Sequence, residues 1–218
     1  MEFLASGDLT RGLEILCGLP ARQVINPLFS LLLSTDREIK WAAVTAFGAV
    51  VSGLACEDME SARVVMRRLM WQLNDESGGI GWGCPEAMGE TMARHEGLGE
   101  EFSRVLVSYI DEDGNYLEYE PLQEGVLWGL ARLAQARPHL VREAEAHLGS
   151  FLDHQNVQLK GLALLIVGFI KTGGYCDKIE KMLGNAEEIE VFLNREFRIY
   201  RIGDLARAAL EQAEGDPG

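Results

Sequence analysis

The residues best suited to acid–base chemistry in this chain are one histidine and three glutamates: His95, Glu86, Glu90 and Glu120. Two carboxylates that converge with an imidazole could transfer protons or hold a metal ion. His95 is followed by Glu96, whereas none of the other histidines has a glutamate after it. One His-Glu pair is too few for a di-iron centre, so we expect no catalytic residue, no metal site and no cofactor.

Two loop motifs resemble ligand-binding loops but lack their decisive residues. The glycine-rich segment 78–83 precedes a helix, yet it follows no strand and has no Lys-Ser/Thr step, so phosphate binding is disfavoured. We expect it to carry Trp82 into solvent. The acidic turn 111–115 is similar to a calcium loop, but the twelfth position is Leu122 instead of a bidentate glutamate. We interpret it as an ordinary acidic turn.

Charge limits the partners. The chain carries 34 acidic and 20 basic side chains, a formal net charge of −14. Residues 86–124 contain eleven of these acids and two arginines, a local net charge of −9 (2 − 11). Such a surface repels phosphate backbones, so we expect a basic protein or peptide as partner and no nucleic acid.

Nothing in the sequence points to a membrane or to export. The longest apolar run, residues 161–170, is about half of what a bilayer span needs. The first residues lack a basic stretch followed by an apolar one. The four cysteines are scattered, which is typical of reduced, buried thiols. We therefore expect a cytoplasmic protein that does not contact membranes.

A glycine recurs with a regular period. Gly48, Gly89, Gly129 and Gly168 are 41, 40 and 39 residues apart, and each follows a large apolar residue. This spacing indicates a structural repeat. Small residues at these positions would let neighbouring helices approach closely.

Each repeat reads as two helices joined by polar turn residues, because apolar positions recur every three or four residues. The expected pairs are Ile25–Ser34 with Glu38–Leu54, Ser61–Leu73 with Pro85–Ala93, Glu101–Ile110 with Pro121–Ala134, and Leu140–Leu152 with Val157–Lys171. Pro85 and Pro121 suit helix starts, where the missing N–H is not needed.

The segment 26–33 (NPLFSLLL), Asp36 and the segment 40–48 (KWAAVTAFG) together resemble a HEAT-type unit. The resemblance to HEAT/armadillo-type repeat proteins covers residues 20–171, and longer linking loops interrupt the second and third pairs. It implies an all-α α-solenoid of about five HEAT-like helix pairs.

The ends of the chain differ from the repeats. Residues 189–201 are rich in β-branched and aromatic residues around Asn194-Arg195, which predicts a β-hairpin, and a terminal helix is expected over Leu205–Ala213. We expect 1–218 to form a single domain: a cap helix within 1–19, repeats over 20–171, and a helix, the hairpin and a capping helix over 172–214.

The fold implied by the resemblance offers a concave face formed by the second helix of each pair. We expect this face to bind a basic protein or peptide, since side chains near the helix starts would meet it. The expected contact residues are Trp82, Glu86, Glu90, Tyr119, Glu120 and Glu124.

Two other functions stay open. One is an enzyme with a carboxylate/His site in the same groove, either hydroxylase-like and metal-dependent or lyase-like; HEAT-like hydroxylases and DNA glycosylases are precedents for chemistry on such repeats. The other is an oligomer-assembly subunit.

Overall fold

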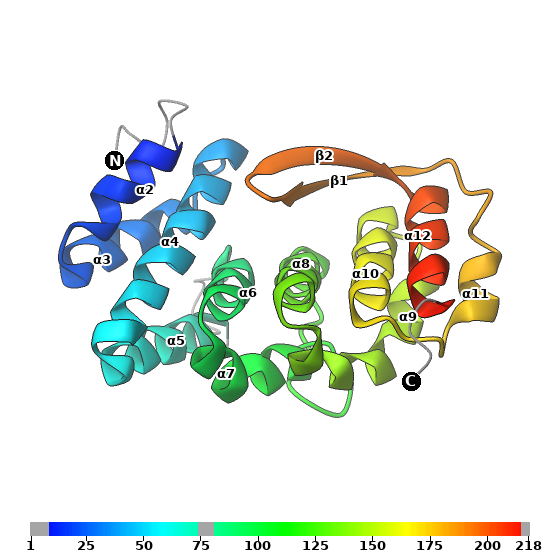
Figure 1. The fold of residues 1–218 in the computed structure, drawn as a ribbon, viewed down its shortest axis with the longest axis horizontal. Helices are drawn as coiled ribbons and strands as arrows, with labels where there is room; N and C mark the ends of the chain where they lie inside the picture. The colour runs from blue at the N-terminus through cyan, green and yellow to red at the C-terminus, as the bar shows by residue number, and fades with distance from the viewer. Residues whose placement is uncertain (1–8, 74–80, 215–218) are drawn as a thin grey trace. The chain divides into compact units, whose positions relative to one another are not determined.

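The computed structural model describes residues 9–73 and 81–214. The chain falls into two compact units, Met1–Phe102 and Ser103–Gly218, and the boundary lies inside helix α7 (Glu96–Ser108). The described residues are helical apart from one β-hairpin (Figure 1), so the predicted all-α class is confirmed. The expectation of a single domain stays a prediction.

The first unit is built around α4 (Arg37–Glu57). This helix packs against α2 (Leu9–Cys17), α3 (Ala21–Leu32), α5 (Met59–Leu73) and α6 (Cys84–Arg94). Asp36 caps its start, because the carboxylate accepts hydrogen bonds from the backbone N–H of Glu38 at 2.9 Å and of Ile39 at 3.2 Å. The expected helices over Leu9–Cys17, Ile25–Ser34, Glu38–Leu54, Ser61–Leu73 and Pro85–Ala93 are all present, with ends that differ by a few residues.

Among the described helices, α4 alone is long and apolar enough to cross a bilayer. Its stretch of highest hydropathy is 56% buried within the protein, and the same composition is typical of a central core helix. Phe47, Val44 and Val51 on this helix are fully buried, and the Phe47 ring meets Phe29 of α3 edge to face at 5.0 Å.

The second unit is built around α10 (Val157–Ile170), which packs on α8 (Glu120–Ala136), α9 (Leu148–Leu152) and α12 (Ile202–Glu214). The short helix α11 (Cys176–Glu180) packs on α12. Asn156 caps α10 by accepting a hydrogen bond from the Gln158 N–H at 2.9 Å. The core residues Leu130, Leu162 and Ile166 are fully buried.

One expected helix is wrong. Residues 140–152 do not form a single α-helix; the chain instead forms the 3₁₀ turns η1 (Pro138–Leu140) and η2 (Arg142–His147), then α9. The Glu145 carbonyl explains part of this, because it accepts hydrogen bonds from the Tyr175 hydroxyl and from the Leu148 N–H in the 3₁₀ pattern. A distant side chain thus competes with the α-helical bond that the carbonyl would otherwise accept.

The predicted hairpin is confirmed. Strand β1 (Glu188–Leu193) pairs antiparallel with β2 (Glu196–Arg201), with Leu193 opposite Glu196 next to the turn. Asn194 and Arg195 form the two-residue turn with positive φ angles of 54° and 69°. Such angles at both central positions are those of a type I′ turn, which matches the twist of the strands.

The expectation of buried thiols is only partly right. Cys84 is buried and Cys176 is half-buried, but Cys17 and Cys56 are exposed. The apolar periodicity does not place these two residues inside, because Cys17 ends α2 and Cys56 precedes the last residue of α4.

Candidate functional site

The six predicted contact residues are divided between the units. Trp82, Glu86 and Glu90 belong to the first unit, at and after the start of α6, whereas Tyr119, Glu120 and Glu124 belong to the second, at the start of α8.

Glu86 lies inside the first unit. Its side chain is 5% exposed and its Oε1 atom accepts a hydrogen bond from the Lys40 ammonium at 2.7 Å. Its Oε2 atom is buried without a hydrogen-bond partner in the described part of the chain. The carboxylate lies in the first turn of α6, where the helix dipole favours a negative charge.

Glu90 is buried as well. Its side chain is 6% exposed and accepts a hydrogen bond from the Arg94 Nε at 2.6 Å, an i,i+4 pair on α6. It packs on Gly48, where an added Cβ would lie 2.5 Å from the Glu90 Cγ. The repeat glycine of α4 therefore makes room for the Glu90 side chain, and both glutamates are held within the unit by cations of their own chain.

Trp82 is half-buried, which corrects the expectation that its loop carries it into solvent. The next residue, Gly83, caps α6 with φ 74°, and a Cβ there would lie 2.9 Å from the Leu32 Cβ. This end of the loop is thus packed against α3. The rest of the glycine-rich segment, residues 78–80, lies outside the described residues.

Cys84 begins α6 beside this packed loop. Burial raises the pKa of its thiol to about 12, and the negative charge of Glu86 contributes in the same direction. A neutral thiol of this kind is a poor nucleophile.

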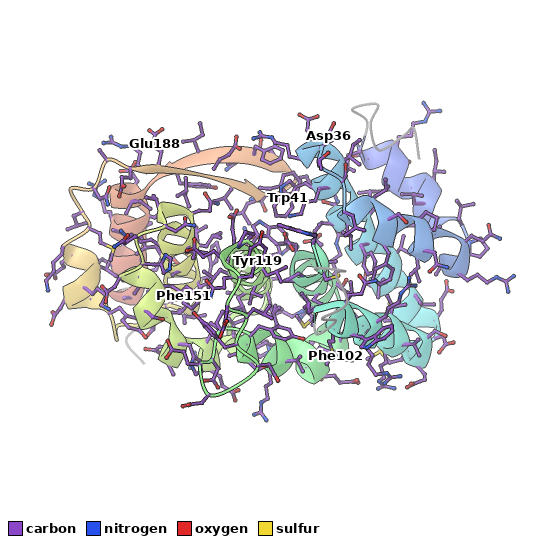
Figure 2. All side chains as sticks on the ribbon, turned by 180° about the vertical axis from the view of Figure 1, so that it is seen from behind. Asp36, Trp41, Phe102, Tyr119, Phe151 and Glu188 are labelled. Atoms are coloured by element: carbon purple, nitrogen blue, oxygen red, sulfur yellow. The ribbon has the colours of Figure 1, made fainter. Side chains whose placement is uncertain are left out.

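The second trio lies at the surface of its unit. Tyr119 is 48% exposed and precedes α8, and Glu120 is exposed in the first helical turn. Glu124 follows one turn later and is half-buried. Figure 2 shows Tyr119 where the chain enters α8.

Glu120 borders an open hollow of about 660 Å³ at the surface of the second unit. The other lining residues come from α9 and from the turn before α10: Ser150, Asp153, His154, Gln155 and Asn156. The Asn156 amide donates to the Glu120 Oε2 at 3.1 Å, which joins the start of α8 to the start of α10.

The polar groups of the hollow are held in place by their neighbours. Asp153 forms an ion pair with Lys178 at 2.6 Å, and His154 Nδ1 accepts the Asn156 N–H at 3.0 Å. Two carboxylates, two amides and one hydroxyl group in one open hollow suit a cationic side chain better than an apolar one.

The sequence predicts Glu120 as a contact residue but does not indicate the other residues that line the hollow. The polar residues 153–156 form the turn before α10, which Asn156 caps. Its closeness to Glu120 depends on α8 and α10 packing side by side, which the repeat period indicates without giving the side-chain contacts.

The residues considered for catalysis have structural partners. His95 Nδ1 accepts a hydrogen bond from the Leu98 N–H at 3.3 Å, so the imidazole caps the start of α7. Asp111 accepts from the Asp113 N–H at 3.0 Å within the acidic turn and lies 3.5 Å from His147. Among residues 9–73 and 81–214, no group of three or more His, Cys, Asp or Glu side chains could hold a metal ion.

No family model matches the chain. An uncharacterized protein of Archaeoglobus fulgidus is 25% identical over 182 residues, which cover 82% of this chain and 91% of the relative. Among solved structures, an engineered protein superposes with a TM-score of 0.58 at 17% identity over 98% of this chain and 94% of its own. A designed armadillo repeat protein, solved in complex with the peptide (KR)4, superposes with a TM-score of 0.54 at 20% identity over 97% of both chains.

The chain has a HEAT/armadillo-type repeat fold.

In the HEAT/armadillo-type repeats of the second unit, α8 and α10 are the predicted second helices of successive pairs, and they pack directly on each other. The hollow therefore lies between the starts of equivalent helices in neighbouring repeats. The sequence predicts contact residues at the helix starts; in the second unit Tyr119 and Glu120 are exposed and Glu124 is half-buried.

Proposed function

We propose that the second unit binds an extended basic peptide, with a Lys or Arg side chain in the hollow beside Glu120. The observation that carries the proposal is the open hollow that contains the Glu120 and Asp153 carboxylates, with the exposed Tyr119 directly before Glu120 in the chain. An aromatic ring can hold the apolar stem of a basic side chain while carboxylates accept its hydrogen bonds.

The fold and the charge support the same partner class. The designed armadillo neighbour was solved with the peptide (KR)4, an alternating Lys-Arg sequence, although likeness at 20% identity carries over only the fold. The net charge of −14 would attract basic chains and repel nucleic acids. We also propose that the protein is cytoplasmic and does not contact membranes.

Within this proposal Tyr119, Glu120 and Glu124 are the direct contacts among the residues predicted from sequence. The other three predicted contacts, Trp82, Glu86 and Glu90, lie in the first unit. Their two carboxylates are buried and paired with Lys40 and Arg94, so these residues would act through the local negative charge and the packing of the first unit. Asp153 and His154 join the set of proposed contacts.

The test is a titration of the fluorescently labelled peptide (Lys-Arg)4 against the full chain and two charge-matched variants. Glu120→Gln/Asp153→Asn removes both carboxylates of the hollow. Glu143→Gln/Glu211→Gln removes the same number of charges at exposed positions that do not line it. Circular dichroism confirms that both variants fold.

We expect the hollow variant to bind the peptide about tenfold more weakly or worse, because charged hydrogen bonds contribute about 1.5–3 kcal/mol each. The Glu143→Gln/Glu211→Gln control should bind within about twofold of wild type. Equal losses in both variants would show that the peptide responds only to net charge, and the proposed site would then be wrong.

A further inference from the structure

The two carboxylates of the hollow in the second unit each have one oxygen engaged by a neighbour. The Asn156 amide donates to the Glu120 Oε2 at 3.1 Å, and the Lys178 ammonium donates to the Asp153 Oδ2 at 2.6 Å. In the part of the chain that the structure describes, no donor bonds to the Glu120 Oε1 or to the Asp153 Oδ1. Each carboxylate therefore offers a ligand one oxygen, and neither offers both.

Lys178 is held beside the hollow by two acceptors. Its ammonium donates to the Gly149 carbonyl at 3.0 Å as well as to Asp153, and its side chain is 31% exposed. The segment before it is attached to the same unit, because the Tyr175 hydroxyl donates to the Glu145 carbonyl. A cation of the chain itself thus occupies one of the four carboxylate oxygens of the hollow.

A third side chain of the hollow also offers a single acceptor. The Ser150 hydroxyl donates to the His147 carbonyl at 3.4 Å, so its oxygen keeps its lone pairs for a donor from a ligand. The acceptors that remain are therefore single oxygens on three separate side chains.

Single oxygens suit one basic side chain better than the other. A guanidinium binds a carboxylate most strongly through two parallel hydrogen bonds, which need both oxygens of one carboxylate. An ammonium is a compact charge with three donors in different directions, so it can bond to one oxygen on each of several side chains.

We propose that the hollow selects lysine over arginine, and that Lys178 sets this preference by holding one oxygen of Asp153. The inference rests on the peptide binding proposed above and names the side chain that enters the hollow. Without the Lys178 ammonium, Asp153 would present both oxygens, and an arginine fork could then bind it.

The experiment measures the dissociation constants of two labelled peptides of equal length and charge, (Lys-Ser)4 and (Arg-Ser)4, for wild type and two variants. Lys178→Met keeps an unbranched apolar side chain and returns both oxygens of Asp153 to the hollow. Lys181→Met removes the same charge from an exposed position that does not line the hollow. Circular dichroism and thermal melting confirm that the variants are folded. The readout is the ratio of the two constants, in which an equal effect of charge on both peptides cancels.

Wild type and Lys181→Met should bind (Lys-Ser)4 at least about threefold more tightly than (Arg-Ser)4. In Lys178→Met the affinity for (Arg-Ser)4 should rise at least about threefold relative to that for (Lys-Ser)4. A wild-type chain that binds the arginine peptide as tightly as the lysine peptide, or more tightly, would overturn the proposal. So would a ratio that Lys178→Met leaves unchanged.

The variant Glu120→Gln/Asp153→Asn separates this inference from the proposed function. If this variant binds both peptides more weakly while wild type shows no lysine preference, the hollow binds basic peptides and only the selectivity is wrong. If the variant binds both peptides as wild type does, the proposed function is wrong and the lysine preference of the hollow is wrong with it.

Discussion

A methyl group at position 48 would lie 2.5 Å from the Cγ of Glu90 and 3.1 Å from its backbone carbonyl carbon. We expect Gly48→Ala to destabilise the protein by about 1–3 kcal/mol, because α4 and α6 must move apart. The gain in helix propensity, about 1 kcal/mol, offsets only part of that cost. Urea unfolding followed by circular dichroism measures the difference.

Gly53 provides the control on the same helix, because a Cβ there would meet nothing within 4 Å. Gly53→Ala should stabilise the protein by about 0.5–1 kcal/mol through helix propensity. If both substitutions change the free energy of unfolding in the same direction and by similar amounts, the close approach of α6 to Gly48 does not limit the size of the residue at position 48.

The cysteines should differ sharply in reactivity. Cys17 and Cys56 are exposed, whereas Cys84 is buried and its pKa is raised to about 12. At pH 8 a thiol-specific disulfide reagent should modify Cys17 and Cys56 at once and Cys84 only after unfolding, as peptide mass mapping would reveal. Rapid native modification of Cys84 would contradict the packed loop around Gly83.

The same shift has a defined effect on stability. The folded-state pKa of Cys84 lies above its ordinary value of 9.0, so the folded chain keeps this proton longer than the unfolded chain. The stabilising contribution of the protonated Cys84 thiol to the free energy of unfolding is complete below about pH 9 and is lost as the pH rises toward 12.

At the scale of elements, the hairpin turn offers a stabilising change. Arg195 has φ 69°, a conformation that costs a non-glycine residue about 1 kcal/mol. Arg195→Gly gives the turn the Asn-Gly sequence that type I′ hairpins prefer, and we expect it to raise stability by about 0.5–1 kcal/mol. Thermal melting measures the gain, and Arg195→Ala, which keeps the Cβ, should show none.

The segment 138–152 shows why a helical pattern does not always give an α-helix. Its apolar residues Val141, Ala144, Leu148 and Leu152 have helical spacing and are buried, as the pattern predicts. Residues 138–147 nevertheless form 3₁₀ turns, and at Glu145 the hydroxyl of Tyr175, 30 residues later, hydrogen-bonds to the carbonyl that an α-helix would use. Periodicity indicates which residues face inward, whereas the type of turn depends on a tertiary contact.

At the scale of the whole molecule, net charge should govern the response to salt. A chain of net charge −14 repels itself in the folded state, and added salt screens this repulsion. Raising NaCl from about 20 mM to about 300 mM should raise the Tm by a few degrees, as differential scanning fluorimetry would show. A fall in Tm would mean that ion pairs such as Lys40–Glu86 outweigh the repulsion.

The sequence by itself determined the helical repeats, the polar turns between their helices, and the hairpin with its Asn194-Arg195 turn. These features depend on residues close together in the chain: apolar periodicity, turn residues and i,i+4 spacing act over a few positions.

Only the tertiary structure decided which carboxylates are interior and which lie at a surface. Glu86 follows Pro85 and Glu120 precedes Pro121, and each lies in the first turn of its helix. The local sequence therefore gives no reason to expect different burial of the two side chains. In the first unit, Lys40 pairs with the buried Glu86, and Gly48 leaves room for the buried Glu90. In the second unit, Asn156 donates a hydrogen bond to Glu120 at the open hollow. The physical reason is that burial of a charge depends on partners from other helices, which sequence spacing alone does not reveal.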